Sequence, residues 1–184
     1  MTSKTNNKRH LILDTTKQII LEKGLHSLTL HEVAENASIS KGGLLYHFPS
    51  KNALVAGLAQ HIFDNYTEQF YAYANQDTQE SGKWTRALIH ASRYDLERNG
   101  ELNAAILASS YLDKEASEQI FNDYNYILKK LNDDQIDPIT TTTIRLAIDG
   151  IYYSQMWDVG SLTEEKISKI LHSLLHMTES EDRL

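Results

Sequence analysis

Residues 39–51 hold the side chains whose types and spacing most clearly indicate a chemistry. The segment has no acidic residue, and its side chains that can reach a phosphate or a base edge are Ser40, Lys41, Tyr46, His47 and Lys51. Gly42 and Gly43 follow the first lysine, although each glycine weakens a helix by about 1 kcal/mol relative to alanine. Such glycines are easiest to explain where a backbone closely approaches another surface. The segment therefore favours DNA contact, and the alternative is a compact helical hairpin within a core.

Two short helices must position these side chains. Thr29 and Glu32 have the spacing of a capping box, which predicts a helix that begins after Thr29. A three-residue turn at 38–40 follows, and Ser40 then caps a second helix that ends before Pro49. Two helices joined in this way form a helix-turn-helix, whose second helix can enter a DNA major groove.

Over roughly residues 8–60, the order and spacing of these residues resemble the TetR family of bacterial transcriptional repressors. That family has a threonine near the start of helix 2, a "vSKGxLYYHFpsK"-like run over helix 3, and a helix 4 that starts at the lysine. Here Leu45-Tyr46 stands where the family usually has two aromatic residues, so one hydroxyl that commonly reaches a phosphate is absent. The resemblance implies DNA contacts from Thr29, Ser40, Lys41, Gly42, Gly43, Tyr46, His47 and Lys51. It also implies a repressor that binds a palindromic operator as a dimer and is released by a small-molecule effector.

Composition sets the broad class of the protein. The chain has 184 residues, two prolines and no cysteine, which favours an all-α fold without disulfides or thiolate metal ligands. No apolar run approaches the roughly 20 residues that span a bilayer, and residues 1–8 lack the apolar core of a secretory signal. We therefore expect a cytoplasmic protein with no membrane partner. Residues 1–55 carry 7 basic and 4 acidic side chains against 11 and 21 in the remainder, which suits DNA contact by the N-terminal part.

Apolar periodicity and capping signals predict about nine helices in two domains. The expected helices lie at about 8–23, 29–37, 40–48, 50–74, 84–98, 102–112, 113–131, 137–159 and from 163 onwards. We assign residues 1–52 to a helix-turn-helix DNA-binding domain, formed by the first three helices and the start of the fourth. Residues 53–184 are then a helical ligand-binding and dimerisation domain.

The last two expected helices carry more apolar surface than one helical layer needs. The helix at 137–159 is apolar on nearly all sides, and Leu146–Ile151 resembles the "LAxDGL" helix of some TetR-type C-terminal domains. The following helix has Leu171 and Leu174 on its apolar side. In that family, the last two helices pair with their symmetry mates as a four-helix bundle. We expect a homodimer through these two helices, and the alternative is that both serve only the core of one chain.

Aromatic residues are concentrated in the C-terminal two thirds of the chain. Tyrosine combines an apolar ring with a polar hydroxyl, which suits a pocket for a small amphipathic molecule. The family resemblance implies an effector site in this region, and our candidates for it are Trp84, Tyr94, Tyr111, Tyr124, Tyr152 and Trp157. Acidic neighbours such as Asp95 or Asp149 could hold an organic cation there. The alternative is that these aromatic residues only fill a helical core.

The sequence gives little support to catalysis. It contains no nucleotide-binding, serine-hydrolase or zinc-protease motif. His172 and His176 have the spacing of metal ligands on a helix, but they supply two ligands where three or four are needed, so we assign no metal and no cofactor. We expect no enzyme. The alternative to a regulator is a helical interaction protein or small helical enzyme that does not read DNA.

Overall fold

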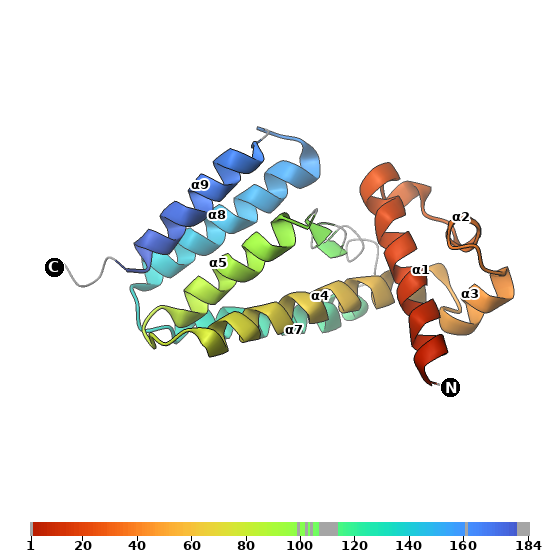
Figure 1. The fold of residues 1–184 in the computed structure, drawn as a ribbon, viewed down its shortest axis with the longest axis horizontal. Helices are drawn as coiled ribbons and strands as arrows, with labels where there is room; N and C mark the ends of the chain where they lie inside the picture. The colour runs from red at the N-terminus through yellow and green to blue at the C-terminus, as the bar shows by residue number, and fades with distance from the viewer. Residues whose placement is uncertain are drawn as a thin grey trace. The chain divides into compact units, whose positions relative to one another are not determined.

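The computed structural model describes residues 2–98, 100, 101, 103, 105, 106, 114–160 and 162–179 of the chain. Every regular element within them is a helix, which confirms the all-α prediction (Figure 1). These elements are α1 (Thr2–Lys23), the 3-10 helix η1 (Leu25–Ser27), α2 (Leu30–Asn36), α3 (Lys41–His47), α4 (Lys51–Gln76), α5 (Lys83–Leu96), α7 (Lys114–Asn132), α8 (Pro138–Trp157) and α9 (Glu164–Met177). The predicted helix at 102–112 falls largely outside the described residues.

The first helix is longer than expected. It begins at Thr2 and not near Lys8. The polar residues in front of Lys8 contain no glycine or proline, so nothing in their backbone chemistry ends the helix before it reaches them.

The described chain divides into two compact units. One contains Met1–Phe63 and Glu101–Phe121, and the other contains Asp64–Gly100 and Asn122–Leu184. The helix α4 begins in the first unit and ends in the second.

The first unit is organised around the helix-turn-helix that the sequence predicted. Its buried apolar side chains come from α1 to α4 and include Ile12, Leu13, Ile20, Leu28, Val33, Leu44, Phe48, Leu54 and Leu58. The predicted caps are present: Thr29 Oγ1 accepts from Glu32 N, and Ser40 Oγ accepts from Gly43 N, each over 3.1 Å. The Glu32 carboxylate pairs with Lys23 Nζ at 2.7 Å, which ties the start of α2 to the end of α1.

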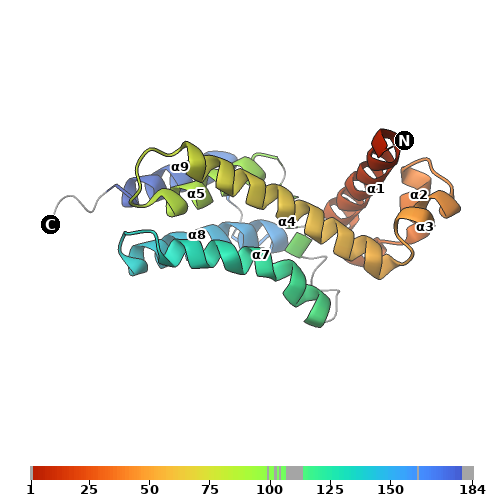
Figure 2. The same ribbon diagram turned by 90° about the horizontal axis from the view of Figure 1, so that it is seen from below.

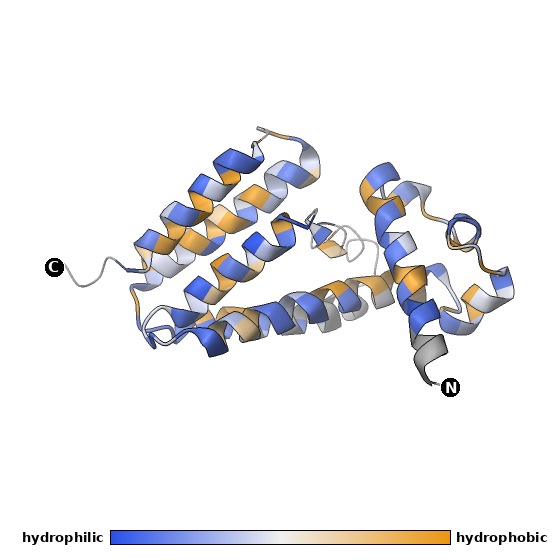
Figure 3. Ribbon diagram, viewed as in Figure 1, coloured by the Kyte–Doolittle hydropathy of each residue, from blue (hydrophilic) through white to orange (hydrophobic). Residues whose placement is uncertain are grey.

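The second unit is a helical bundle in which α5 packs against both α8 and α9, and these two helices pack against each other (Figure 2). Phe70 of α4 stacks on Trp84 of α5, with 5.6 Å between ring centroids. Apolar and polar residues alternate around each helix, as expected when only one face is buried (Figure 3).

A buried carboxylate outside α5 caps the start of that helix. The residue before α5 is Gly82, which has no side chain to serve as a cap. Asp134, in the connection between α7 and α8, accepts from the backbone N–H groups of Trp84 at 2.8 Å and Thr85 at 2.6 Å. Burial raises the pKa of Asp134, although these hydrogen bonds oppose the rise. The α7–α8 connection therefore supplies the anionic partner that a helix N-terminus favours.

No helix in the described part of the chain is both long and apolar enough to cross a membrane.

Candidate nucleic-acid interface and interior polar cluster

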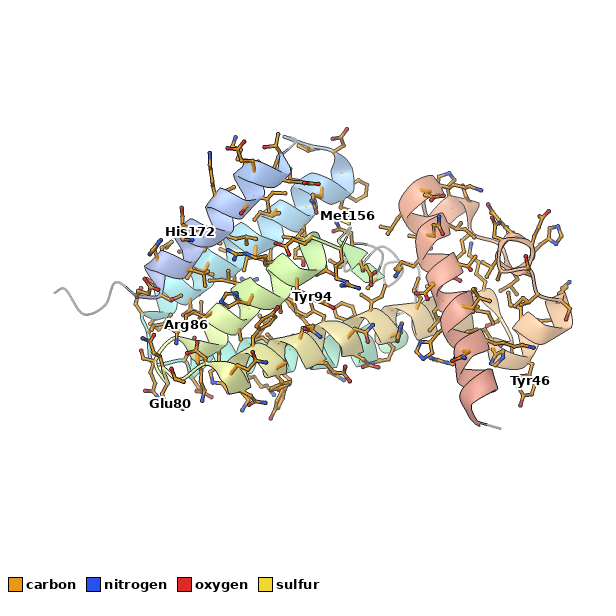
Figure 4. The ribbon with its side chains drawn as sticks, in the orientation of Figure 1. Tyr46, Glu80, Arg86, Tyr94, Met156 and His172 are labelled. Atoms are coloured by element: carbon orange, nitrogen blue, oxygen red, sulfur yellow. The ribbon has the colours of Figure 1, made fainter. Side chains whose placement is uncertain are left out.

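The helix α3 presents its predicted DNA-contacting residues on one exposed side. Lys41, Gly42, Gly43 and Tyr46 are exposed, whereas Leu44 is fully buried in the core of the first unit. The Tyr46 side chain is 80% exposed and projects away from the helix (Figure 4). Within the described part of the chain, Lys41 makes no ion pair. This side of α3 therefore combines a cation, an aromatic hydroxyl and a backbone without side-chain cover.

The two glycines of α3 have different surroundings. A Cβ atom on Gly42 would meet no other atom within 4 Å, so the fold of this chain does not require glycine there. A Cβ atom on Gly43 would lie 3.2 Å from Ser40 Oγ, the atom that caps the helix. Gly43 therefore has a local reason to be glycine, whereas no neighbouring atom of the fold requires glycine at position 42.

The other four predicted contact residues flank this surface. Thr29 and Ser40 are the exposed N-cap residues of α2 and α3. His47 is half-buried, and its ring lies edge-on to Tyr46 with 5.2 Å between centroids. Lys51 is the first residue of α4, and Ser50 Oγ accepts from Ala53 N to cap that helix. All eight residues thus lie at the start of α2, along α3 or at the start of α4.

Two residues that the motif did not reveal, Arg9 and Gly57, support this surface. The Arg9 guanidinium lies over the Phe48 ring, 5.3 Å from its centroid, so α1 covers the residue that ends α3. Gly57 of α4 contacts the same ring. A glycine in the interior of a helix was the available signal for Gly57, because helices rarely keep glycine without a packing reason.

An interior polar cluster lies between helices of the second unit. Tyr66 Oη and Ser92 Oγ are 2.8 Å apart, and Tyr152 Oη donates to Asp95 Oδ2 at 2.9 Å. All four residues are buried. Burial raises the pKa of both tyrosines well above the usual value, so their hydroxyls stay protonated and can donate hydrogen bonds.

A second set of polar groups adjoins this cluster. Tyr124 Oη donates to Asp149 Oδ1 at 3.2 Å, and Arg145 Nη1 donates to Asp149 Oδ2 at 2.6 Å. Burial raises the pKa of Asp149, against the lowering effect of Arg145. Arg145 and Asp149 lie on α8, the helix that also carries Tyr152 of the first set. The bundle thus offers hydroxyl donors and carboxylate acceptors in two sets: the first set is buried, whereas the Asp149 side chain of the second set is 41% exposed.

The six aromatic candidates for an effector site occupy different places. Tyr152 belongs to the buried polar cluster, and Tyr124 belongs to the half-buried set that contains Asp149. Trp84 stacks on Phe70 near the start of α5, eight residues or about 12 Å along the helix from Ser92. Trp157 is 56% exposed at the end of α8.

The two remaining candidates add little to this picture. Tyr94 is half-buried, and its ring lies 4.9 Å from the Arg98 guanidinium. Tyr111 lies outside the described residues.

The helix α8 carries an exposed apolar stripe. Ile139, Leu146, Tyr153 and Trp157 recur at intervals of seven, seven and four residues, and each is more than half exposed. Gly150 lies beside this α8 stripe, and a Cβ atom there would meet nothing within 4 Å. Leu171 and Leu174 of α9, in contrast, are only 1% and 6% exposed within the chain's own core.

Two family models match the chain. Residues 12–58 match the bacterial regulatory proteins of the tetR family, and residues 82–179 match the tetracyclin repressor-like C-terminal domain. The second match alone covers more than half of the chain.

Two curated relatives match about a third of the chain each. The regulator YuxN of Bacillus subtilis is 35% identical over 57 residues, which cover 31% of this chain and 20% of that protein. The regulator RutR of Escherichia coli is 38% identical over 69 residues, which cover 33% of this chain and 32% of that protein. The chain thus matches only a fifth to a third of the length of these relatives.

The solved structure of the fatty acid degradation regulator FadR from Bacillus halodurans has a similar fold. Its TM-score is 0.71, and the match covers 94% of this chain and 98% of that chain at 16% identity. At this level of identity, the likeness concerns the fold alone.

Proposed function

Because the chain belongs to the TetR family of bacterial transcriptional regulators, we propose that it is a repressor that binds a palindromic operator as a homodimer and is released by a small-molecule effector. The observation that carries the proposal is the exposed side of α3, where Lys41, Gly42 and Tyr46 lie on a capped helix of a helix-turn-helix. In this proposal, residues 1–52 bind DNA, and residues 53–184 bind the effector and form the dimer.

The DNA contacts follow from the chemistry of α3 and its neighbours. Lys41 reaches a base edge or a nearby phosphate from the first turn of the helix, and Gly42 and Gly43 allow close approach of the backbone. Tyr46 and Lys51 hold flanking phosphates. The remaining predicted contacts to the DNA backbone come from Thr29, Ser40 and His47.

The α8 stripe supports a dimer through α8 and α9. Four large apolar side chains on one exposed helix face, next to Gly150, suit close packing against a second helix. A two-fold partner presents the same stripe, so the two copies are self-complementary. The two α3 helices then meet successive major grooves about 34–36 Å apart, or at a modestly longer spacing, which requires a palindromic operator.

The effector site lies in the second unit and includes Tyr124 and Tyr152. A small, largely apolar molecule is held by the apolar core, and the hydroxyls of the interior polar groups orient it. The other candidates in this unit are Trp84, Tyr94 and Trp157, and the sixth candidate, Tyr111, lies outside the described residues. Effector and operator oppose each other through a coupling free energy of about 1–3 kcal/mol, which acts equally in both directions.

The role is regulatory and needs no catalytic group, cofactor or metal. A bacterial regulator that binds operator DNA works in the cytoplasm, where that DNA lies.

Selection from random-sequence DNA tests the proposal. The full chain should enrich sites made of two inverted half-sites. The Leu146→Glu variant, which places a charge on the α8 stripe, should enrich no such pairs. Recovery of unrelated sequences by the unaltered chain would contradict the proposed function.

A further inference from the structure

Two histidines of α9 form an arrangement that the proposed DNA contacts and effector site do not use. His172, labelled in Figure 4, lies one helical turn before His176, and both side chains are exposed. Their Nε2 atoms are 3.1 Å apart, and the two rings are nearly perpendicular, with an interplanar angle of 84°. The Nε2 atoms of the two rings therefore lie close enough together for one bound ion to contact both.

Glu179 fixes the tautomer of this pair. His176 Nδ1 lies 3.2 Å from Glu179 Oε2, and an ionised carboxylate only accepts hydrogen bonds, so the Nδ1 atom carries the proton. Neutral His176 then has its lone pair on Nε2, and His172 Nε2–H donates to it. A carboxylate behind a histidine is also the arrangement that orients imidazoles in metal sites.

The distance between the nitrogens suits two ligands of one metal ion. With metal–nitrogen bonds of about 2.0–2.1 Å, two such ligands lie about 2.9 Å apart at a right angle and about 3.3 Å apart at the tetrahedral angle. The observed 3.1 Å falls between these values. A metal ion can replace the proton that lies between the two Nε2 atoms. His172 then binds the metal through Nε2 and carries its proton on Nδ1.

We propose that His172 and His176 chelate a divalent transition-metal ion, with Glu179 as a positioning residue. Two imidazoles favour Zn²⁺, Ni²⁺ or Cu²⁺ over Mg²⁺ or Ca²⁺. Among the residues that the structure describes, no three histidine, cysteine, aspartate or glutamate side chains form a group that could hold a metal. The chain therefore supplies two ligands, and water or a second chain completes the coordination. The bound ion links two successive turns of α9 and stabilises the end of that helix.

Zinc titration calorimetry of the full chain, without a histidine tag and stripped of metal by a chelator, tests this site. We expect micromolar binding of Zn²⁺ at one ion per chain, or at one ion per two chains if a second copy supplies ligands. His172→Gln and His176→Gln should each weaken binding at least tenfold. The matched control His26→Gln/His31→Gln removes two exposed histidines from the first unit and should bind as the unaltered chain does.

A second pair of variants tests Glu179. Glu179→Gln should weaken zinc binding about tenfold and keep its stoichiometry. Glu165→Gln removes an exposed carboxylate that pairs with Lys169 at 2.6 Å and should leave zinc binding unchanged. With Cu²⁺ as a second probe, electron paramagnetic resonance should show coupling to two imidazole nitrogens. Absence of zinc binding, or equal binding by the histidine variants and their control, would overturn the proposal.

Discussion

The ring of Phe48 lies so close to Gly57 that a Cβ atom at position 57 would come within 2.6 Å of Phe48 Cε1. Phe48 directly follows α3, and Gly57 lies in the second turn of α4. This contact holds the end of α3 against α4, the helix that continues into the second unit. Any shift of α4 at Gly57 therefore acts on the residue that anchors the proposed recognition helix.

Replacement of Gly57 by alanine should destabilise the first unit. The buried Phe48 ring must move to admit the methyl group, so we expect the free energy of unfolding to fall by about 1–3 kcal/mol. Gly42→Ala is the matched control, because its methyl group meets nothing within 4 Å and should raise helix stability by about 1 kcal/mol. Urea unfolding measures the free energy of unfolding of both variants. Equal effects of the two substitutions would contradict the close contact between Gly57 and the Phe48 ring.

The same Gly42→Ala variant should bind operator DNA more weakly than the unaltered chain. The methyl group is tolerated by the fold, so lost affinity reports contact with DNA and not a folding defect. We expect a loss of about tenfold, measured by fluorescence anisotropy with a selected operator. Unchanged affinity would mean that DNA does not approach the backbone at this position.

Leu146→Glu should convert the dimer to monomers without unfolding the chain. The Leu146 side chain is 56% exposed, so a charge there costs little within one chain but is buried in the proposed interface. Leu174→Glu is the contrasting variant and should unfold the second unit, because Leu174 is only 6% exposed. Sedimentation separates monomer from dimer, and circular dichroism reports the fold. A folded dimer of Leu146→Glu would exclude the α8 stripe as the interface.

The Asp77–Arg86 ion pair should make stability depend on pH. Asp77 Oδ2 lies 2.6 Å from Arg86 Nε, and the Arg86 side chain is only 9% exposed. Burial alone would raise the pKa of Asp77, but the Arg86 hydrogen bond and charge, with a backbone N–H, bring it below the ordinary value. The stabilisation of the folded chain by this ion pair is therefore fully present above the pKa that Asp77 has in the unfolded chain. It disappears as the pH falls through the lower pKa that Asp77 has in the folded chain.

Asp77→Asn should consequently lower the free energy of unfolding at pH 7 by about 3 kcal/mol, because it leaves a buried guanidinium without its carboxylate. The difference from the unaltered chain should stay constant down to about pH 5 and narrow below about pH 4. Urea unfolding across this range provides the measurement. A difference that grows on acidification would contradict the assigned pKa direction.

Local signals in the sequence predicted the helix starts well. Thr29, Ser40, Asp137 and Thr163 each cap the helix that follows, because a cap depends on residues only a few positions apart. The exposed side of α3 follows from the same local pattern.

Contacts between distant residues could not be read from the sequence. The cap of α5 comes from Asp134, which lies 50 residues beyond Trp84 in the sequence. Tyr152 likewise donates a hydrogen bond to Asp95, although the two residues are 57 positions apart. The periodicity of the sequence also shows that α8 and α9 are rich in apolar residues. It does not show which of these residues are buried in the core of the same chain. Only the structure separates buried Leu171 from the exposed Leu146.

The most direct test of the central claim is the operator affinity of the Lys41→Ala/Tyr46→Ala variant. Lys129→Ala/Tyr126→Ala removes the same residue types from exposed positions of α7 and serves as the matched control. Anisotropy titration over a range of salt concentrations should show at least about tenfold weaker binding and a shallower salt dependence for the α3 variant alone. Equal affinity of the folded α3 variant and its control would contradict DNA recognition by α3.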